Sequence, residues 1–199
     1  VSKFDWKKHE DKINKFSNFK KNVDGIEMHF IQEKGSGSNS QPLLITHGWP
    51  GSIFESLHII NKLAHPEKFG GKVEDAFDVI VPSLPGFGFS GKPSRPIGPR
   101  KMAEILNKLM TNNLGYKSYI AHGGDWGGTI SNWIAYDHSK SCRGIHINFL
   151  SMRLPEGPQN KDEEKWDKEF TKGQEMEEGY RTQQSTKPQT LSYAMMDSP

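Results

Sequence analysis

The sequence predicts an α/β fold in which a mainly parallel, twisted sheet is flanked by helices and followed by a second, helical module. Short apolar runs alternate with segments of helical spacing between residues 43 and 149, an order typical of parallel strands joined by helical crossovers. A glycine-rich turn at residues 123–128 joins one of these strands directly to a helix. After Leu150 the composition changes, with prolines and a glycine before a charged helical stretch, so we place the end of the sheet there.

The elements before residue 43 are less regular. Residues 4–21 are rich in lysine and place Trp6 and Ile13 at roughly helical spacing, which predicts an amphipathic helix with a solvated face. Residues 26–30 alternate apolar and polar side chains, the pattern of a half-buried strand. The glycines and serines of residues 35–40 predict a loop.

From residue 43 onward the periodicity assigns each element. We expect strands at residues 43–46, 77–81, 119–121 and 143–149, and helices at residues 53–64, 102–110, 127–136 and 161–178. Because the connections are helical, the strands should run parallel in one sheet.

Length and composition limit the classes of function. With 199 residues one domain is expected, since domains average about 150 residues. Aromatic residues make up 11% of the chain, which is enough for a core, so disorder throughout is excluded. The net charge of +2 gives no electrostatic reason to expect nucleic acid or an anionic membrane as a partner.

The cysteine content and the length of the apolar runs exclude further classes of protein. The single cysteine, Cys142, excludes an internal disulfide and a zinc site built on several thiolates, and we expect no metal and no cofactor. The longest apolar runs, such as residues 43–45, fall far short of the roughly 20 residues that a spanning helix needs. The chain begins at Val1 without a hydrophobic signal region. We therefore expect a soluble, cytoplasmic protein and leave homo-oligomerisation open.

The turn Gly-Gly-Asp-Trp-Gly-Gly at residues 123–128 carries the strongest chemical signal. It has the form of a nucleophile elbow, in which small residues flank a nucleophile on a sharp strand-to-helix turn. Such a turn strains the backbone and lifts the central side chain, here Asp125, above the sheet. The alternative is an ordinary glycine-rich turn in which Asp125 caps the helix.

A second loop, His-Gly-Trp-Pro-Gly-Ser at residues 47–52, follows the first core strand. Ligands bind at the carboxyl ends of strands in sheets of this kind, which places this loop beside Asp125. The backbone N–H groups of Trp49 and Trp126 are then expected to converge on one oxygen as an oxyanion hole. We interpret His47 as an anchor of the loop through hydrogen bonds, not as a catalytic base.

These motifs resemble those of the microsomal-type epoxide hydrolase family within the α/β-hydrolases. The matching segments are residues 47–52, 123–127, the stretch Leu-Pro-Gly-Phe-Gly-Phe-Ser at 84–90, and downstream Glu178-Gly179-Tyr180, Gln184, Thr186-Lys187-Pro188 and Asp197-Ser198-Pro199. The resemblance implies an α/β-hydrolase core at residues 1–149 and part of a helical lid at residues 150–199. It also implies that Tyr180 polarises the epoxide oxygen.

The residues suit that chemistry. A carboxylate such as Asp125 opens a strained ring by in-line attack and leaves an ester on the enzyme, while a phenol such as Tyr180 stabilises the departing oxygen. Water then cleaves the ester to give a vicinal diol. Phe87 and Phe89, together with Trp126, indicate a lipophilic small-molecule epoxide as the substrate.

A general base for the water is missing from the sequence pattern. In α/β-hydrolases the order is nucleophile, acid, histidine, and only His138 and His146 follow Asp125. His138 should lie at the far end of the elbow helix, and His146 inside a strand among apolar neighbours, where packing in the sheet is expected. Asn148 is not a carboxylate. The resemblance places the acid, a second lid tyrosine and the histidine beyond this chain, so we expect a fragment that cannot turn over substrate alone.

Two other functions stay open, and a third is rejected. A haloalkane-type dehalogenase also uses an aspartate at the elbow, with Trp49 as a nominal halide partner, and a non-catalytic binding protein of the same fold is the other alternative. The segment at residues 86–91 matches the G-x-G-x-x-G dinucleotide fingerprint. A helix should follow that fingerprint at once, and Pro93 and Pro96 forbid it.

Overall fold

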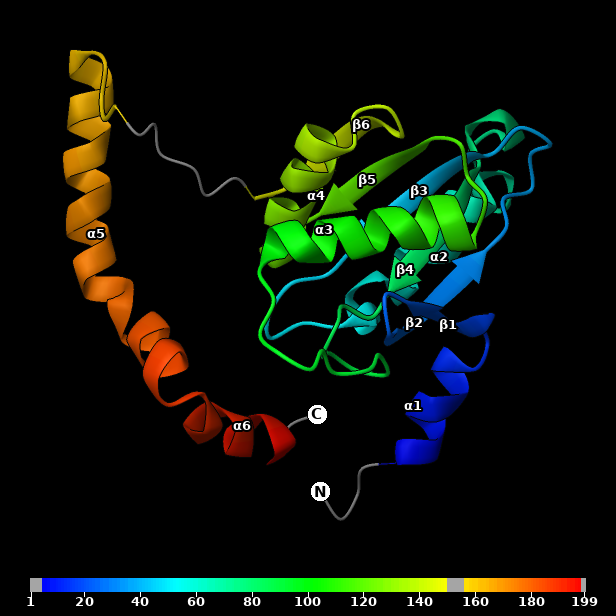
Figure 1. Ribbon diagram of the computed structural model, residues 1–199, viewed down its shortest axis with the longest axis horizontal. Coiled ribbons are helices and arrows are strands. Elements are labelled where there is room, and N and C mark those ends of the chain that lie inside the picture. The colour runs from blue at the N-terminus through cyan, green and yellow to red at the C-terminus, as the bar shows by residue number, and fades with distance from the viewer. Residues whose placement is uncertain (1–4, 150–155, 198–199) are drawn as a thin grey trace. The chain divides into compact units, whose positions relative to one another are not determined.

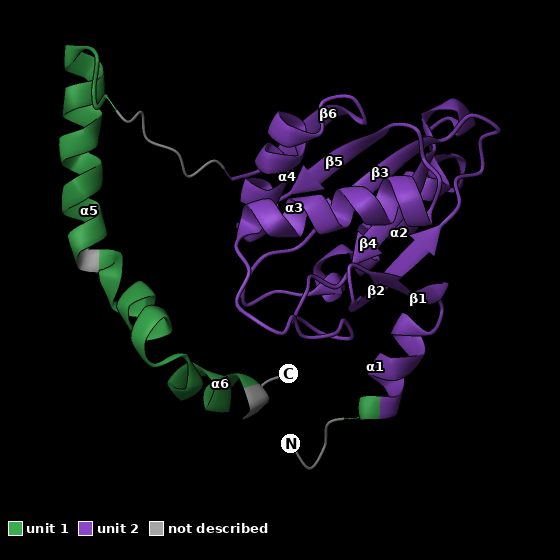
Figure 2. Ribbon diagram, viewed as in Figure 1, with its two compact units in different colours: residues 1–6, 152–199 green, residues 7–151 purple. Residues whose placement is uncertain are grey.

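The computed structural model describes residues 5–149 and 156–197. Contacts divide the chain into two compact units, residues 7–151 and residues 152–199 with residues 1–6 (Figure 2). The predicted boundary at residue 150, and the Ser198-Pro199 end of the last matching motif, lie outside the described residues.

The larger unit is built on one six-stranded sheet with the order β1-β2-β4-β3-β5-β6 (Figure 1). Strands β3, β4, β5 and β6 are mutually parallel, whereas β1 and β2 form an antiparallel hairpin and β2 pairs with β4 antiparallel. The strands are β1 Asn18–Val23, β2 Ile26–Glu33, β3 Gln41–Thr46, β4 Phe77–Pro82, β5 Tyr119–Gly123 and β6 Cys142–Ile147. The predicted mainly parallel sheet is therefore confirmed.

Helices cover both faces of this sheet, α3 and α4 in front and α2 behind in Figure 1. Two apolar clusters fill the spaces between the layers, one rich in residues of α3 and α4 and the other containing residues of α2. The helices of this unit are α1 Trp6–Ile13, α2 Leu57–Ala64, α3 Pro99–Lys108 and α4 Trp126–Asp137, with short helical turns at Ile53–Ser56, Pro66–Phe69, Val73–Asp75 and Leu109–Asn113.

The amino-terminal prediction is wrong in its second half. The helix expected over residues 4–21 ends at Ile13, and β1 begins at Asn18. The strand forms because Asp24 and Gly25, both at positive φ, close a tight hairpin with β2, and an Asp-Gly pair is a strong hairpin signal. Charged side chains on β1 stay exposed, so lysine content alone did not distinguish helix from strand.

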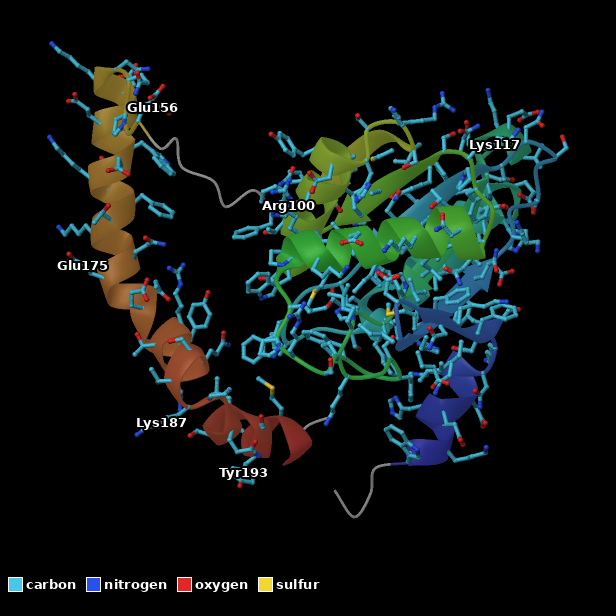
Figure 3. The ribbon with its side chains drawn as sticks, in the orientation of Figure 1. Arg100, Lys117, Glu156, Glu175, Lys187 and Tyr193 are labelled. Atoms are coloured by element: carbon cyan, nitrogen blue, oxygen red, sulfur yellow. The ribbon has the colours of Figure 1, made fainter. Side chains whose placement is uncertain are left out.

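Helix α4, which follows the elbow, is tied to α3 at its far end. Arg100, labelled in Figure 3 at the start of α3, donates from Nε and one terminal nitrogen to the two carboxylate oxygens of Asp137, both at 2.7 Å. Its guanidinium also lies over the Trp133 ring, 4.5 Å from the ring centroid. A bidentate pair of this kind fixes orientation as well as distance, so α4 is held at the end opposite Asp125.

Strand β6 lies at the edge of the sheet, and most of its side chains are exposed. His146 was expected to pack in the core or within the sheet. It does lie beside His122 of β5, with Nδ1 2.8 Å from Nδ1 of that residue, but it is exposed, so the expected burial is wrong. The physical reason is the position of β6, which has a neighbouring strand on one side only among the described residues.

The smaller unit consists of α5 Lys161–Thr186 and α6 Pro188–Asp197 (green in Figure 2). Helix α5 starts at Asn160, whose side-chain oxygen accepts from the Glu163 N–H while its amide donates to the Glu163 carboxylate. Such a reciprocal cap explains the start of the helix. No helix in the described part of the chain is both long and apolar enough to span a bilayer.

Candidate active site

The elbow at residues 123–128 has the predicted strained geometry. Asp125 has φ 50° and ψ −125°, outside the regions that L-residues favour, at a cost of about 1–3 kcal/mol. The turn also brings α4 so close to the end of β3 that a Cβ on Gly127 would overlap the Thr46 carbonyl oxygen. One added to Gly123 would overlap the Gly127 backbone. Glycine at both positions is thus a packing requirement.

The carboxylate of Asp125 faces the loop after β3. The backbone N–H of Trp49 donates to Asp125 Oδ1 at 2.8 Å. Although Asp125 occupies the cap position of α4, its side chain makes no capping hydrogen bond, so the alternative reading as an ordinary cap is wrong. Trp126 is the first residue of α4, and the N–H of a first helical residue has no partner within its helix.

Glycine is also required in the loop that the carboxylate faces. A Cβ at Gly48 would overlap Asp125 Oδ1 and lie 2.5 Å from Asp125 Cβ. The carboxylate therefore fits against bare backbone, within reach of the amide that follows. This contact explains why Gly precedes the donor residue Trp49.

His47 is buried, with 2% of its surface exposed. Its Nδ1 lies 2.8 Å from the Gly48 carbonyl oxygen, and its Nε2 accepts the backbone N–H of Leu84 at 3.1 Å. A nitrogen that accepts carries no proton, so the ring is neutral with its proton on Nδ1. Burial lowers the pKa of His47 below its ordinary value. The predicted loop-anchoring role is confirmed.

The segment at residues 83–91 forms a compact loop beside His47 and His29. The Phe87 ring meets the His47 ring edge to face at a centroid distance of 5.3 Å, and the Phe89 ring meets His29 in the same way at 5.1 Å. The next helix begins at Pro99, so the segment lacks the helix that directly follows a dinucleotide fingerprint. Phe89 is 46% exposed; substrate contact by either ring stays a prediction.

A buried polar chain beneath this loop was missed from the sequence. His29 on β2 lies 3.0 Å from Ser83 Oγ through Nδ1 and 3.0 Å from Asn18 Oδ1 through Nε2. The Asn18 amide nitrogen donates to the carbonyls of Ile13 and Phe16, which fixes Oδ1 as the acceptor. Nε2 of His29 therefore carries a proton and donates to Asn18 Oδ1. Burial lowers its pKa to about 4.

This buried histidine should make stability depend on pH. Unfolded His29 binds a proton near pH 6.5, whereas the folded protein does not until about pH 4. The unfolded state therefore gains a proton first, and the free energy of unfolding should fall as pH drops through this window. We expect a smaller fall in melting temperature between pH 7 and 4.5 for His29→Gln than for the wild type. An equal fall in both would contradict the assignment, and His58→Gln on the exposed face of α2 is the matched control.

The remaining candidate residues are Tyr180 and His138. Tyr180 lies on α5 in the smaller unit and is 59% exposed, so its role stays a prediction. His138 directly follows α4, at the opposite end of that helix from Asp125. Among residues 5–149 and 156–197, no three His, Cys, Asp or Glu side chains gather in a way that could hold a metal ion.

Two protein-family models match the chain. The one described as "Epoxide hydrolase N terminus" matches residues 1–56, and the one described as "alpha/beta hydrolase fold" matches residues 41–193. The second range contains both the residue 47–52 loop and the elbow. The matched ranges together leave only the last few residues uncovered.

Relatives in sequence and structure agree with these models. Epoxide hydrolase 1 of Sus scrofa is 36% identical over 219 residues, covering 98% of this chain and 48% of the relative. The structure of Aspergillus niger epoxide hydrolase matches with a TM-score of 0.78 at 28% identity, over 98% of this chain and 51% of that one. Juvenile hormone epoxide hydrolase from the silkworm Bombyx mori matches with a TM-score of 0.73 at 30% identity, over 99% and 46%. The predicted resemblance is confirmed, and the chain spans about half the length of these relatives.

Proposed function

Because this chain belongs to the α/β-hydrolase fold family, we propose that the protein it forms hydrolyses lipophilic epoxides with Asp125 as the nucleophile. One observation carries the proposal: the Trp49 N–H holds Asp125 Oδ1 at 2.8 Å at the tip of a strained turn. A carboxylate in that position suits alkylation chemistry, whereas a hydroxyl there would suit ester cleavage. The similarity to epoxide hydrolases over nearly the whole chain supports an epoxide as the substrate.

The hydrogen bond to Oδ1 assigns different tasks to the two carboxylate oxygens. Oδ2 attacks an epoxide carbon, the ring C–O bond breaks, and the released oxygen takes a proton from the Tyr180 hydroxyl. Oδ1 then becomes the carbonyl oxygen of the ester. When water adds to this ester, a general base takes one of its protons and negative charge develops on Oδ1. The Trp49 N–H already binds Oδ1, and the Trp126 N–H is the second donor of the oxyanion hole. Collapse of this intermediate expels the diol oxygen, which takes back from the general base the proton that water lost. The Asp125 carboxyl group formed in this step returns its proton to the Tyr180 phenolate, which restores both groups and leaves the vicinal diol as the product.

The first test is to identify the covalent intermediate. The whole protein is mixed with an aryl epoxide, quenched in acid within milliseconds to seconds, and digested for mass spectrometry. We expect a mass increase equal to that of the epoxide on the peptide that carries Asp125. An adduct on another residue, or diol formation without any adduct, would overturn the proposal. A parallel reaction with a chloroalkane separates the dehalogenase alternative, because that enzyme would form an alkyl ester with loss of chloride.

The role of Tyr180 is tested in the same experiment. Tyr180→Phe removes the proton donor, so the adduct should still form on Asp125 but about 10²- to 10⁴-fold more slowly, as for loss of a general acid. Tyr193→Phe, on the exposed surface of α6, is the matched control and should leave the rate unchanged. Equal rates in both variants would remove Tyr180 from the mechanism.

A further inference from the structure

The peptide that joins Gly48 to Trp49 is bonded on both of its edges. Its carbonyl oxygen lies 2.8 Å from His47 Nδ1, and its N–H donates to Asp125 Oδ1 at 2.8 Å. A trans peptide is planar, with C=O and N–H pointing in opposite directions. Any rotation of the carbonyl away from His47 therefore turns the N–H away from Asp125.

The second nitrogen of the same ring reaches a different segment. His47 Nε2 accepts the Leu84 N–H at 3.1 Å, and the Phe87 ring, three residues further on, packs edge to face on the imidazole. The His47 ring thus contacts both the peptide that carries the Trp49 donor and the loop that carries Phe87 and Phe89. Both bonds hold together only while Nδ1 donates and Nε2 accepts.

We propose that His47 is a positioning residue that sets the direction of the Trp49 N–H and links it to the residue 83–91 loop, and that it does so only as the neutral Nδ1–H tautomer. This inference rests on the proposed function for its catalytic consequence. Protonation places a proton on Nε2, so two donors face each other where Leu84 N–H was accepted. The ring or the loop must then move, and the Gly48-Trp49 peptide loses its fixed orientation.

Burial and the charges around His47 determine whether its ring is neutral or protonated. The charged group that acts on the ring is Glu55, which follows the loop and favours the protonated form. Asp125 is connected to the ring only through the Gly48-Trp49 peptide, whose N–H it accepts. Residues 84–87 bring no ionisable side chain. Burial opposes protonation more strongly than Glu55 favours it. The neutral form therefore persists below pH 6.5, and the link should break only under acid conditions.

Nuclear magnetic resonance tests this coupling without reference to activity. In protein labelled with ¹⁵N, the His47 ring should show the Nδ1–H tautomer and titrate below pH 6.5, and the Trp49 amide signal should shift with the same midpoint. His47→Asn should abolish that titration at Trp49, because its amide reaches the Gly48 carbonyl but has no imidazole proton to gain. His58→Asn, an exposed histidine on α2, should leave it in place. An Nε2–H tautomer, or a Trp49 amide that does not follow His47, would overturn the proposal.

Kinetics of the two chemical steps test the consequence for catalysis. His47→Gln loses the donor at the Nδ1 position, so ester hydrolysis should slow by about tenfold or more, as when an oxyanion donor is lost or misdirected. Asn at the same position keeps that donor and should hydrolyse within a few-fold of the wild type. Equal slowing in Gln and Asn variants would reduce His47 to a packing role. Absence of any ester in the wild type would instead refute the proposed function. The magnetic resonance experiment would still test whether His47 positions the Trp49 N–H.

Discussion

Replacing Asp125 by asparagine is expected to slow formation of the epoxide adduct by about 10³-fold or more, the scale typical for loss of a catalytic nucleophile. The amide is neutral and a poor nucleophile, so the attack by the second oxygen is lost. Its shape is retained, and an amide oxygen can still accept the Trp49 N–H that now binds Oδ1 at 2.8 Å. The melting temperature should therefore change little. Acid-quench mass spectrometry gives the rate, and circular dichroism gives the melting temperature.

The matched control for this variant is Asp75→Asn, the same change at an exposed carboxylate in the turn Val73–Asp75. It should react at the wild-type rate. If Asp125→Asn alkylates within tenfold of the wild type, with an intact mass that excludes deamidation back to aspartate, the nucleophile lies elsewhere. A large fall in melting temperature would show that the carboxylate is needed for the fold itself.

Much of the catalytic core was predictable because its constraints are local in sequence. The elbow requires small residues around Asp125 for steric reasons, and the structure shows the overlaps that any Cβ would cause at Gly123 and Gly127. The loop after β3 follows a strand whose apolar run fixes its position. Parallel strands then place both turns at the same edge of the sheet, so proximity of Trp49 to Asp125 follows from topology.

The missing parts depend on contacts between residues distant in sequence. His29 bonds Ser83, which is 54 residues away in the sequence, and Asn18, which is 11 residues away. No spacing rule relates a buried histidine to such partners. Strand β1 is recognisable only through its pairing with β2, because its own side chains are mostly exposed. The Asp24-Gly25 turn was the one available signal for that hairpin, and the lysine pattern concealed it.

Replacing Gly127 by alanine is expected to destabilise the protein by about 3 kcal/mol, the upper part of the range for overpacking. A Cβ there would overlap the Thr46 carbonyl oxygen and lie 2.9 Å from the His47 carbonyl oxygen. These are backbone atoms of β3 and the following loop, so no side-chain rotation relieves the overlap. Helix propensity acts in the opposite direction, since alanine is favoured over glycine by about 1 kcal/mol inside a helix. Chemical denaturation measures the difference.

Gly173→Ala separates packing from propensity, because Gly173 lies within α5 and an added Cβ would meet nothing within 4 Å. That variant should be as stable as the wild type or more so. If both alanine variants gain stability, α4 does not lie as close to the end of β3 as the structure places it, and the strained position of Asp125 loses its steric basis. If only Gly127→Ala loses stability, the close approach that raises Asp125 above the sheet is supported independently of any activity measurement.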